Sequence, residues 1–152
     1  MTLALAWEPL SRLLDEGVAS LAYVHWLEAG DDQASVGFFP DWPAMCRLNR
    51  AGAFRVAALR KDGELIGYNA FHVTPHILYG ATLYALNQGV YVEPQHRGFA
   101  GGKLLLGSEK LLREAGVGKV VYSVPVANKK LDAVLGRLGY SLAETFRSKL
   151  LG

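Results

Sequence analysis

The residues best suited to chemistry form one glycine-rich segment, Pro94-Gln95-His96-Arg97-Gly98-Phe99-Ala100-Gly101-Gly102-Lys103. A strand-like run over residues 86–93 precedes it, and a helical run over residues 103–112 follows it. A strand, a glycine turn and a helix start together gather unpaired backbone N–H groups, and the helix dipole attracts an anion. The glycines also let a ligand approach where a Cβ atom would block it. The segment therefore predicts a site for phosphate or pyrophosphate, with Arg97 and Lys103 as supporting cations.

The spacing of the glycines separates this segment from two common nucleotide-binding loops. A Walker A loop needs four residues between its first glycine and the Gly-Lys pair, followed by Ser or Thr. Here three residues separate Gly98 from Gly102, and Leu104 stands where the hydroxyl is needed. A dinucleotide fingerprint needs Gly-x-Gly-x-x-Gly, which the segment also lacks. The segment therefore belongs to neither class.

The rest of the chain predicts the elements that must position this turn. We expect helices over residues 8–26 and 41–52, a hairpin with strands over 54–58 and 65–73 and an Asp62-Gly63 turn, and a loop over 74–80. After the turn we expect a helix ending at Gly116, a strand over 119–124, a helix over 128–138 and a final strand over 140–150. This order predicts a mixed α/β (α+β) fold. In this fold we expect a central, mostly antiparallel sheet with helices on both faces.

Length and composition are typical of one domain over residues 1–152, because 51% of the chain is hydrophobic and 20% is charged. A net charge of +2 and the lack of a basic stripe in the sequence argue against a nucleic-acid partner. We expect neither a signal peptide nor a membrane-spanning segment. The single cysteine, Cys46, is expected to be a buried, inert thiol. These limits favour a cytoplasmic enzyme that acts on a small molecule or a peptide.

The glycine-rich segment resembles the Gln/Arg-x-x-Gly-x-Gly/Ala signature of the GCN5-related N-acetyltransferase (GNAT) superfamily, with Gln95, Gly98 and Ala100 at the defining positions. The predicted order of elements matches that superfamily over nearly the whole chain. His25-Trp26 and Asp41-Trp42 have counterparts in a phage- and bacterium-associated branch. The resemblance implies the GNAT fold and direct transfer of an acetyl group from acetyl-CoA to a primary amine, without a metal. It also implies a set of residues that bind acetyl-CoA: Val90, Tyr91, Val92, Gln95, His96, Arg97, Gly98, Phe99, Ala100, Gly101, Gly102, Lys103 and Asn128.

The family also implies an oxyanion donor, which we expect to be a free backbone N–H on the strand over residues 90–92. In the family a bulge parts this strand from the next parallel one, and Gly89 permits such a bulge. The acceptor amine is expected to enter past the loop over residues 74–80, where His76 and Tyr79 would contact it.

The groups for proton transfer are harder to assign, because the usual residue types are missing. The resemblance puts Leu135 where a Tyr acid often stands, and Asn87 and Gln88 where an acidic residue is frequent. The candidates that remain are Tyr122, Ser123 and His76, with Tyr79, Glu93 or a water molecule as alternatives. His25 is interpreted as a packing residue and a cation favoured by its helix dipole, and His72 as a strand-face residue.

Two other functions stay open at the level of the sequence. One is a catalytically silent module that binds or senses acyl-CoA, and the other is a nucleotide-phosphate-binding protein that uses the turn without CoA. The acceptor amine, the acyl chain and the assembly state, a homodimer included, stay open as well.

Overall fold

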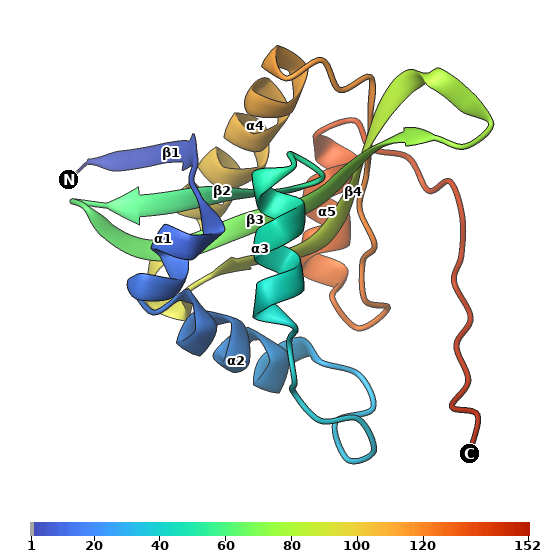
Figure 1. Cartoon of the computed structure of the whole chain (residues 1–152), viewed down its shortest axis with the longest axis horizontal. Coiled ribbons are helices and arrows are strands. Elements are labelled where there is room, and N and C mark those ends of the chain that lie inside the picture. Colours follow the sequence, from blue (N-terminus) through green and yellow to red (C-terminus); the bar gives the residue numbers. More distant parts are fainter. Residues whose placement is uncertain (1) are drawn as a thin grey trace.

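The computed structural model describes residues 2–152 and contains a five-stranded sheet with helices on both faces (Figure 1). The strands β1 (Leu3–Trp7), β2 (Phe54–Lys61), β3 (Glu64–His76), β4 (Tyr79–Val92) and β5 (Lys119–Val121) lie side by side in chain order. The pairs β1–β2, β2–β3 and β3–β4 are antiparallel, and the pair β4–β5 is parallel. The helices are α1 (Leu10–Asp15), α2 (Val18–Ala29), α3 (Trp42–Arg50), the short 3-10 helix η1 (Pro94–His96), α4 (Phe99–Glu114) and α5 (Lys129–Arg137). The predicted fold class is confirmed.

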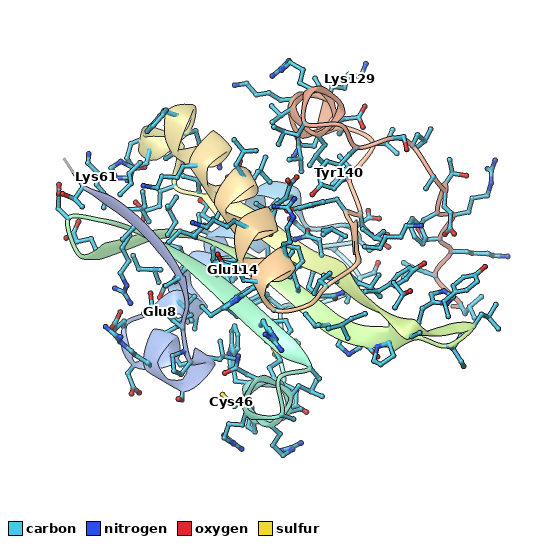
Figure 2. All side chains as sticks on the ribbon, turned by 90° about the horizontal axis from the view of Figure 1, so that it is seen from above. Glu8, Cys46, Lys61, Glu114, Lys129 and Tyr140 are labelled. Atoms are coloured by element: carbon cyan, nitrogen blue, oxygen red, sulfur yellow. The ribbon has the colours of Figure 1, made fainter. Side chains whose placement is uncertain are left out.

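The sheet separates two layers of apolar side chains. Cys46 of α3 and Glu114 of α4 mark its opposite sides in Figure 2. Val56 of β2 packs in the layer under α1 and α3, whereas Leu59 of the same strand packs under α4 with Leu104. Side chains of a strand alternate between faces, so one strand serves both layers.

Local signals in the sequence are confirmed at the hairpin and at two helix starts. Asp62 and Gly63 have φ values of 49° and 88°, which a tight two-residue hairpin turn requires at both positions. The side chain of Asp41 accepts a hydrogen bond of 2.9 Å from the Ala44 N–H at the start of α3. The side chain of Asn128 likewise accepts a hydrogen bond of 3.1 Å from the Leu131 N–H at the start of α5.

Four expectations about elements are wrong or incomplete. The helix predicted over residues 8–26 is divided at Gly17, whose φ of 92° is left-handed. The predicted loop over 74–80 is instead a continuous hairpin, in which β3 and β4 extend to a turn at residues 77–78. Strand β1 was not predicted. The final strand predicted over 140–150 is not formed. These residues extend away from the sheet, and no strand pairs with them (Figure 1). A segment with strand-forming residues becomes a strand only where it has a pairing partner.

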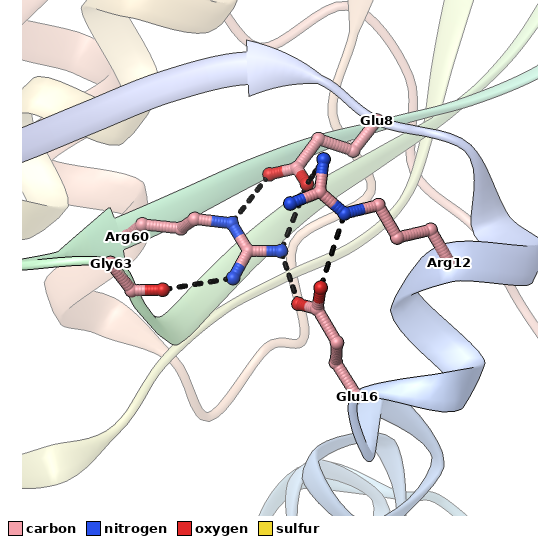
Figure 3. Close-up of polar contacts among 5 residues, drawn as sticks. All are labelled: Glu8, Arg12, Glu16, Arg60 and Gly63. Atoms are coloured by element: carbon pink, nitrogen blue, oxygen red, sulfur yellow. Dashed lines mark hydrogen bonds and ion pairs between the residues drawn. The ribbon is translucent and has the colours of Figure 1, made fainter.

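A polar cluster around Arg60 joins β2 to the junction of β1 and α1 (Figure 3). Its guanidinium donates hydrogen bonds of 2.8 and 2.9 Å to the two carboxylate oxygens of Glu8 and one of 3.0 Å to the Gly63 carbonyl. It also contacts the carboxylate of Glu16, which accepts a second bond of 3.1 Å from Arg12. Hydrogen bonds from Arg60 and then from Arg12 lower the pKa of Glu16, and the bond to Glu8 is the main cause of a raised pKa of Arg60.

Within residues 2–152, none of the helices is both long enough and apolar enough to cross a lipid bilayer.

Candidate active site

Strands β4 and β5 part beside the predicted cofactor-binding residues. They pair only where Tyr84 to Leu86 lie opposite Lys119 to Val121, so residues 87–92 of β4 have no strand on that side. A bulge begins at the same point, since Ala70 pairs with Gly89 and Phe71 pairs with Asn87. Gln88 is left as the extra residue. The bulge expected at Gly89 is therefore present, and it opens a gap between two parallel strands.

The backbone of Val90 and Val92 faces this gap. The Glu93 N–H donates a 2.9 Å hydrogen bond to the Ile66 carbonyl of β3, and successive residues of an extended strand point to alternate sides. The backbone N–H and C=O groups of Tyr91 therefore point toward β3, whereas those of Val90 and Val92 point away from it. The Arg97 side chain donates a 2.9 Å bond to the Val92 carbonyl from the gap side, as this alternation requires. The Val90 N–H is thus directed into the gap.

The glycine-rich turn follows at the end of β4 and begins α4. Gly98 has φ 91° and ψ −114°, a backbone conformation that favours glycine. No side chain caps α4, so the N–H groups of its first turn lack helical partners until Gly102 donates to the Gly98 carbonyl. A Cβ atom added at Gly98, Gly101 or Gly102 would meet no atom within 4 Å. Free amides and open space at a helix start suit an anionic group such as a phosphate.

The two predicted cations at the turn already have partners within the protein. Arg97 donates a 2.8 Å hydrogen bond to Glu28 and lies 5.5 Å from the centre of the Tyr91 ring. This contact lowers the pKa of Glu28 and raises the pKa of Arg97. The Lys103 ammonium donates a 2.7 Å bond to the Leu3 carbonyl. Backbone amides are therefore the donors that the turn has free.

A cavity of about 720 Å³ lies between α2, α3 and the sheet, and it reaches the gap. Gln88, Gly89 and Val90 of β4 line it at one end, together with Ser123 and Asn128 from the segments flanking β5 and α5. The other walls are mainly apolar and include aromatic rings from α2, α3 and the strands. The cavity is of the size and character that small-molecule sites have.

His25 of α2 stands where the cavity meets the bulge. Its Nδ1 atom lies 2.6 Å from the Tyr68 hydroxyl oxygen, and its ring stacks on Tyr91 with 4.9 Å between centroids. A Cβ atom at Gly89 would lie 3.3 Å from the His25 Cε1 atom. Burial lowers the pKa of His25, against an opposing effect of Glu28, and burial raises the pKa of Tyr68. Burial therefore favours the neutral form of His25, against the interpretation as a helix-dipole cation, whereas its interpretation as a packing residue is confirmed by the stacking on Tyr91.

The structure brings some of the predicted site residues together and separates others. Ser123, Val90 and Asn128 line the cavity. Tyr122 lies in the other layer, where its hydroxyl accepts a 2.9 Å bond from Asn69 and burial raises its pKa to about 12. Its place in that layer keeps it away from the cavity lining.

The hairpin residues His76 and Tyr79 lie outside the cavity lining. Their rings stack on one another with 4.7 Å between centroids, and Tyr79 is exposed. Leu135 is buried in α5, and Leu131 is the α5 residue that lines the cavity. Sequence reasoning missed the positions of His25 and His72, both of which line the cavity. The adjacent residues His25-Trp26, which have counterparts in a branch of the family, were the one sequence feature that singled out His25. Helical spacing does not show which residue of the sheet a side chain will contact.

Asn87, which stands where the family often has an acidic residue, belongs to a buried amide network. Its amide donates to the Asn69 side-chain oxygen at 2.6 Å and to the Ala70 carbonyl at 3.2 Å. Asn69 in turn donates to Ser108 at 3.0 Å and to the Tyr122 hydroxyl. Among the described residues, no buried side-chain nitrogen or oxygen lacks a partner. A satisfied network of this kind fixes the bulge of β4 in one position.

The comparisons with known proteins agree with this geometry. A family model described as "Acetyltransferase (GNAT) family" matches residues 14–140. The chain therefore belongs to the GNAT acetyltransferase family, and the predicted family is confirmed. A search of curated proteins found no match.

Similar solved structures cover the chain along its length. An aminoglycoside acetyltransferase from an uncultured soil metagenomic sample is 15% identical, with a TM-score of 0.76 and 100% of each chain covered. A GCN5-related N-acetyltransferase from Ralstonia eutropha is 18% identical, with a TM-score of 0.76 over 99% of this chain and 100% of that one. Glucosamine-6-phosphate N-acetyltransferase from Arabidopsis thaliana is 15% identical, with a TM-score of 0.69 and 100% of each chain covered. At these identities the likeness shows the fold alone.

Proposed function

We propose that this protein transfers the acetyl group of acetyl-CoA to the primary amine of a small molecule. One observation carries the proposal. The Val90 N–H is directed into the gap between β4 and β5, a cavity of about 720 Å³ reaches this gap, and the uncapped start of α4 follows the end of β4. A donor held at the turn and along the gap would present its acyl group to an acceptor held in the cavity.

The residues of the turn and of β4 fit the parts of acetyl-CoA. The amides of residues 98–101 would hold the pyrophosphate, because they are unpaired and stand at the positive end of a sixteen-residue helix. The backbone of Val90 and Val92 would pair with the pantetheine amides in place of the missing strand. Asn128 lies at the far side of the gap, where its carboxamide oxygen already accepts a bond of 3.1 Å from Leu131.

The chemistry then needs an oxyanion donor and a proton acceptor. Bound acetyl-CoA supplies an activated thioester carbonyl. The Val90 N–H donates a hydrogen bond to the oxygen on which negative charge develops. In the tautomer that this chemistry requires, His25 donates its Nδ1 proton to the Tyr68 oxygen, 2.6 Å away, and Nε2 accepts a proton from the attacking amine. Ser123 also lines the cavity and is the candidate hydrogen-bond donor that stabilises the leaving thiolate without losing its own proton.

A combined binding and turnover experiment tests this function. Isothermal titration with acetyl-CoA, CoA and ATP should show binding of the two CoA species only. Release of free thiol from acetyl-CoA should then depend on an added amine. Binding of CoA without amine-dependent thiol release would favour a catalytically silent acyl-CoA-binding module instead. Binding of ATP in preference to CoA would reject both.

A further inference from the structure

We infer that the acceptor is an aromatic monoamine with no second charged group, an inference that rests on the acetyltransferase function proposed above. The first observation is the charge of the cavity. Within residues 2–152, no Asp, Glu, Lys or Arg side chain lines it. Its titratable lining residues are His25, His72 and Tyr68. The pKa shifts already described keep His25 and Tyr68 uncharged at neutral pH.

The second observation is that aromatic side chains form much of the cavity lining. Trp26 of α2 and Phe38 of the following segment pack with ring centroids 5.7 Å apart, and both line the cavity. Trp42 and Phe54 line it as well. Flat aromatic faces of this kind stabilise an aromatic ligand by offset or edge contacts in addition to burying its area.

The third observation is where the polar groups lie. His25, Asn87 and Gln88 meet the cavity at the β4 bulge, whereas the Trp and Phe rings come from α2, α3, β2 and the segment between α2 and α3. An acceptor would therefore place its nitrogen at the bulge and its apolar body among the rings. A nitrogen that is uncharged before it enters suits this site, because no carboxylate stands there to pair with an ammonium.

The same observations argue against the acceptors named for the structural neighbours. Those proteins include aminoglycoside acetyltransferases and a glucosamine-6-phosphate N-acetyltransferase. An aminoglycoside carries several ammonium groups that need carboxylate partners, and a sugar phosphate needs cations. Glu28 lies near His25, but it is already paired with Arg97 and is not part of the lining.

The test measures thiol release from acetyl-CoA with the full chain and five amines: 4-propylaniline, 2-phenylethylamine, kanamycin, spermidine and glucosamine 6-phosphate. We expect kcat/KM for the two aromatic monoamines to exceed that for kanamycin, spermidine and glucosamine 6-phosphate by at least a hundredfold. 4-Propylaniline should be the better of the two, because its nitrogen is uncharged at neutral pH whereas 2-phenylethylamine must lose a proton first. A higher value for any of those three would overturn the inference while leaving the acetyltransferase function intact. If acetyl-CoA does not bind in the titration, the proposed function fails.

Amine binding is measured separately, so that the inference is tested even without turnover. Titration with 4-propylaniline should change the fluorescence of Trp26 and Trp42 in a saturable manner, and kanamycin should not. Leu48→Glu adds a carboxylate at the cavity lining, where the wild-type side chain is 44% exposed. It should weaken 4-propylaniline binding at least tenfold and improve kanamycin binding. Leu27→Glu is the matched control, since Leu27 is 50% exposed and lies outside the lining. Absence of saturable 4-propylaniline binding, or equal effects of the two variants, would overturn the inference.

Discussion

His25 and Tyr68 lie 43 positions apart in the chain, and their side chains meet with 2.6 Å between the imidazole Nδ1 and the phenol oxygen. The contact ties α2 to β3 at the edge of the cavity. The other imidazole nitrogen, Nε2, takes no part in this contact. The proposed proton transfer depends on this pair.

Replacing His25 with Gln should lower kcat by roughly a hundredfold or more, which is the usual contribution of a general base. Because burial lowers the pKa of His25, the wild-type kcat/KM should stay high to below pH 6.5 and fall only at lower pH. The variant should lose this pH dependence and keep its affinity for acetyl-CoA, measured by isothermal titration. A variant with the wild-type pH profile would exclude His25 as the base. Tyr68→Phe should have the smaller effect, since it removes only the partner that orients the ring.

The same histidine should make stability depend on pH. Its native pKa lies below the value of about 6.5 in the unfolded chain, so the unfolded state binds more protons below that pH. This group's contribution to stability is therefore constant at higher pH and decreases as the pH falls below about 6.5. Thermal unfolding of the wild type and of His25→Gln between pH 5 and 8 checks the sign. The wild type should lose more Tm on acidification; an equal loss in both proteins would contradict the prediction.

Gly101→Val should lower the affinity for acetyl-CoA at least tenfold without unfolding the protein. Gly101 is in the first turn of α4, and an added Cβ meets only the open space that we assign to pyrophosphate. Valine is also the better helix former of the two residues. Gly136→Val in α5 is the control, because its added Cβ also meets no atom within 4 Å. Gly98→Val should abolish binding too, but its φ of 91° adds backbone strain that a lower Tm would reveal.

Gly67→Ala should lower the free energy of unfolding by about 1–3 kcal/mol, the usual range for overpacking a core. A Cβ at Gly67 would lie 2.5 Å from the Tyr91 carbonyl oxygen and 3.1 Å from the Val92 Cα atom, and neither backbone atom can move without shifting β4. Gly136→Ala should instead raise stability by about 0.5–1 kcal/mol, because alanine restricts the unfolded chain and suits a helix. Denaturant unfolding of the two variants measures both effects. A neutral Gly67→Ala would show that β4 can move.

Arg60→Met should lower the free energy of unfolding by about 2–4 kcal/mol, since it leaves the nearly buried Glu8 carboxylate with only a longer contact of 3.6 Å to Arg12. The side chains of Arg60 and Glu8 are 15% and 10% exposed. Arg12→Met should change stability by less than about 1 kcal/mol, because its side chain is 60% exposed and surface pairs contribute little. Unfolding in urea at pH 7 compares the two. Similar losses in both variants would mean that the cluster in Figure 3 acts as one exposed network.

Much of the fold and part of the site could be predicted from the sequence, because the signals are local. Asp62-Gly63 could be assigned to a turn and Asp41 to a helix cap from residue types alone, and both assignments are confirmed. Gly98 and its neighbours predicted an anion site from the same kind of information, and the free amides of α4 support it. The predicted strand over residues 140–150 failed for the opposite reason, since its pattern depends on a partner elsewhere in the chain.

The sequence by itself therefore determined the glycine turn, the central run of strands and helices and the family, because each depends on residues close together in the chain. Only the tertiary structure decided which side chains share the cavity. Tyr122 and Ser123 are adjacent in sequence, yet only Ser123 lines the cavity, because neighbouring residues of an extended chain face opposite sides. His25 enters the cavity because the packing of α2 on the sheet turns it toward Tyr68 and Gly89. Packing of distant segments also gave the cavity a lining without Asp, Glu, Lys or Arg among the described residues, and no local pattern encodes that property.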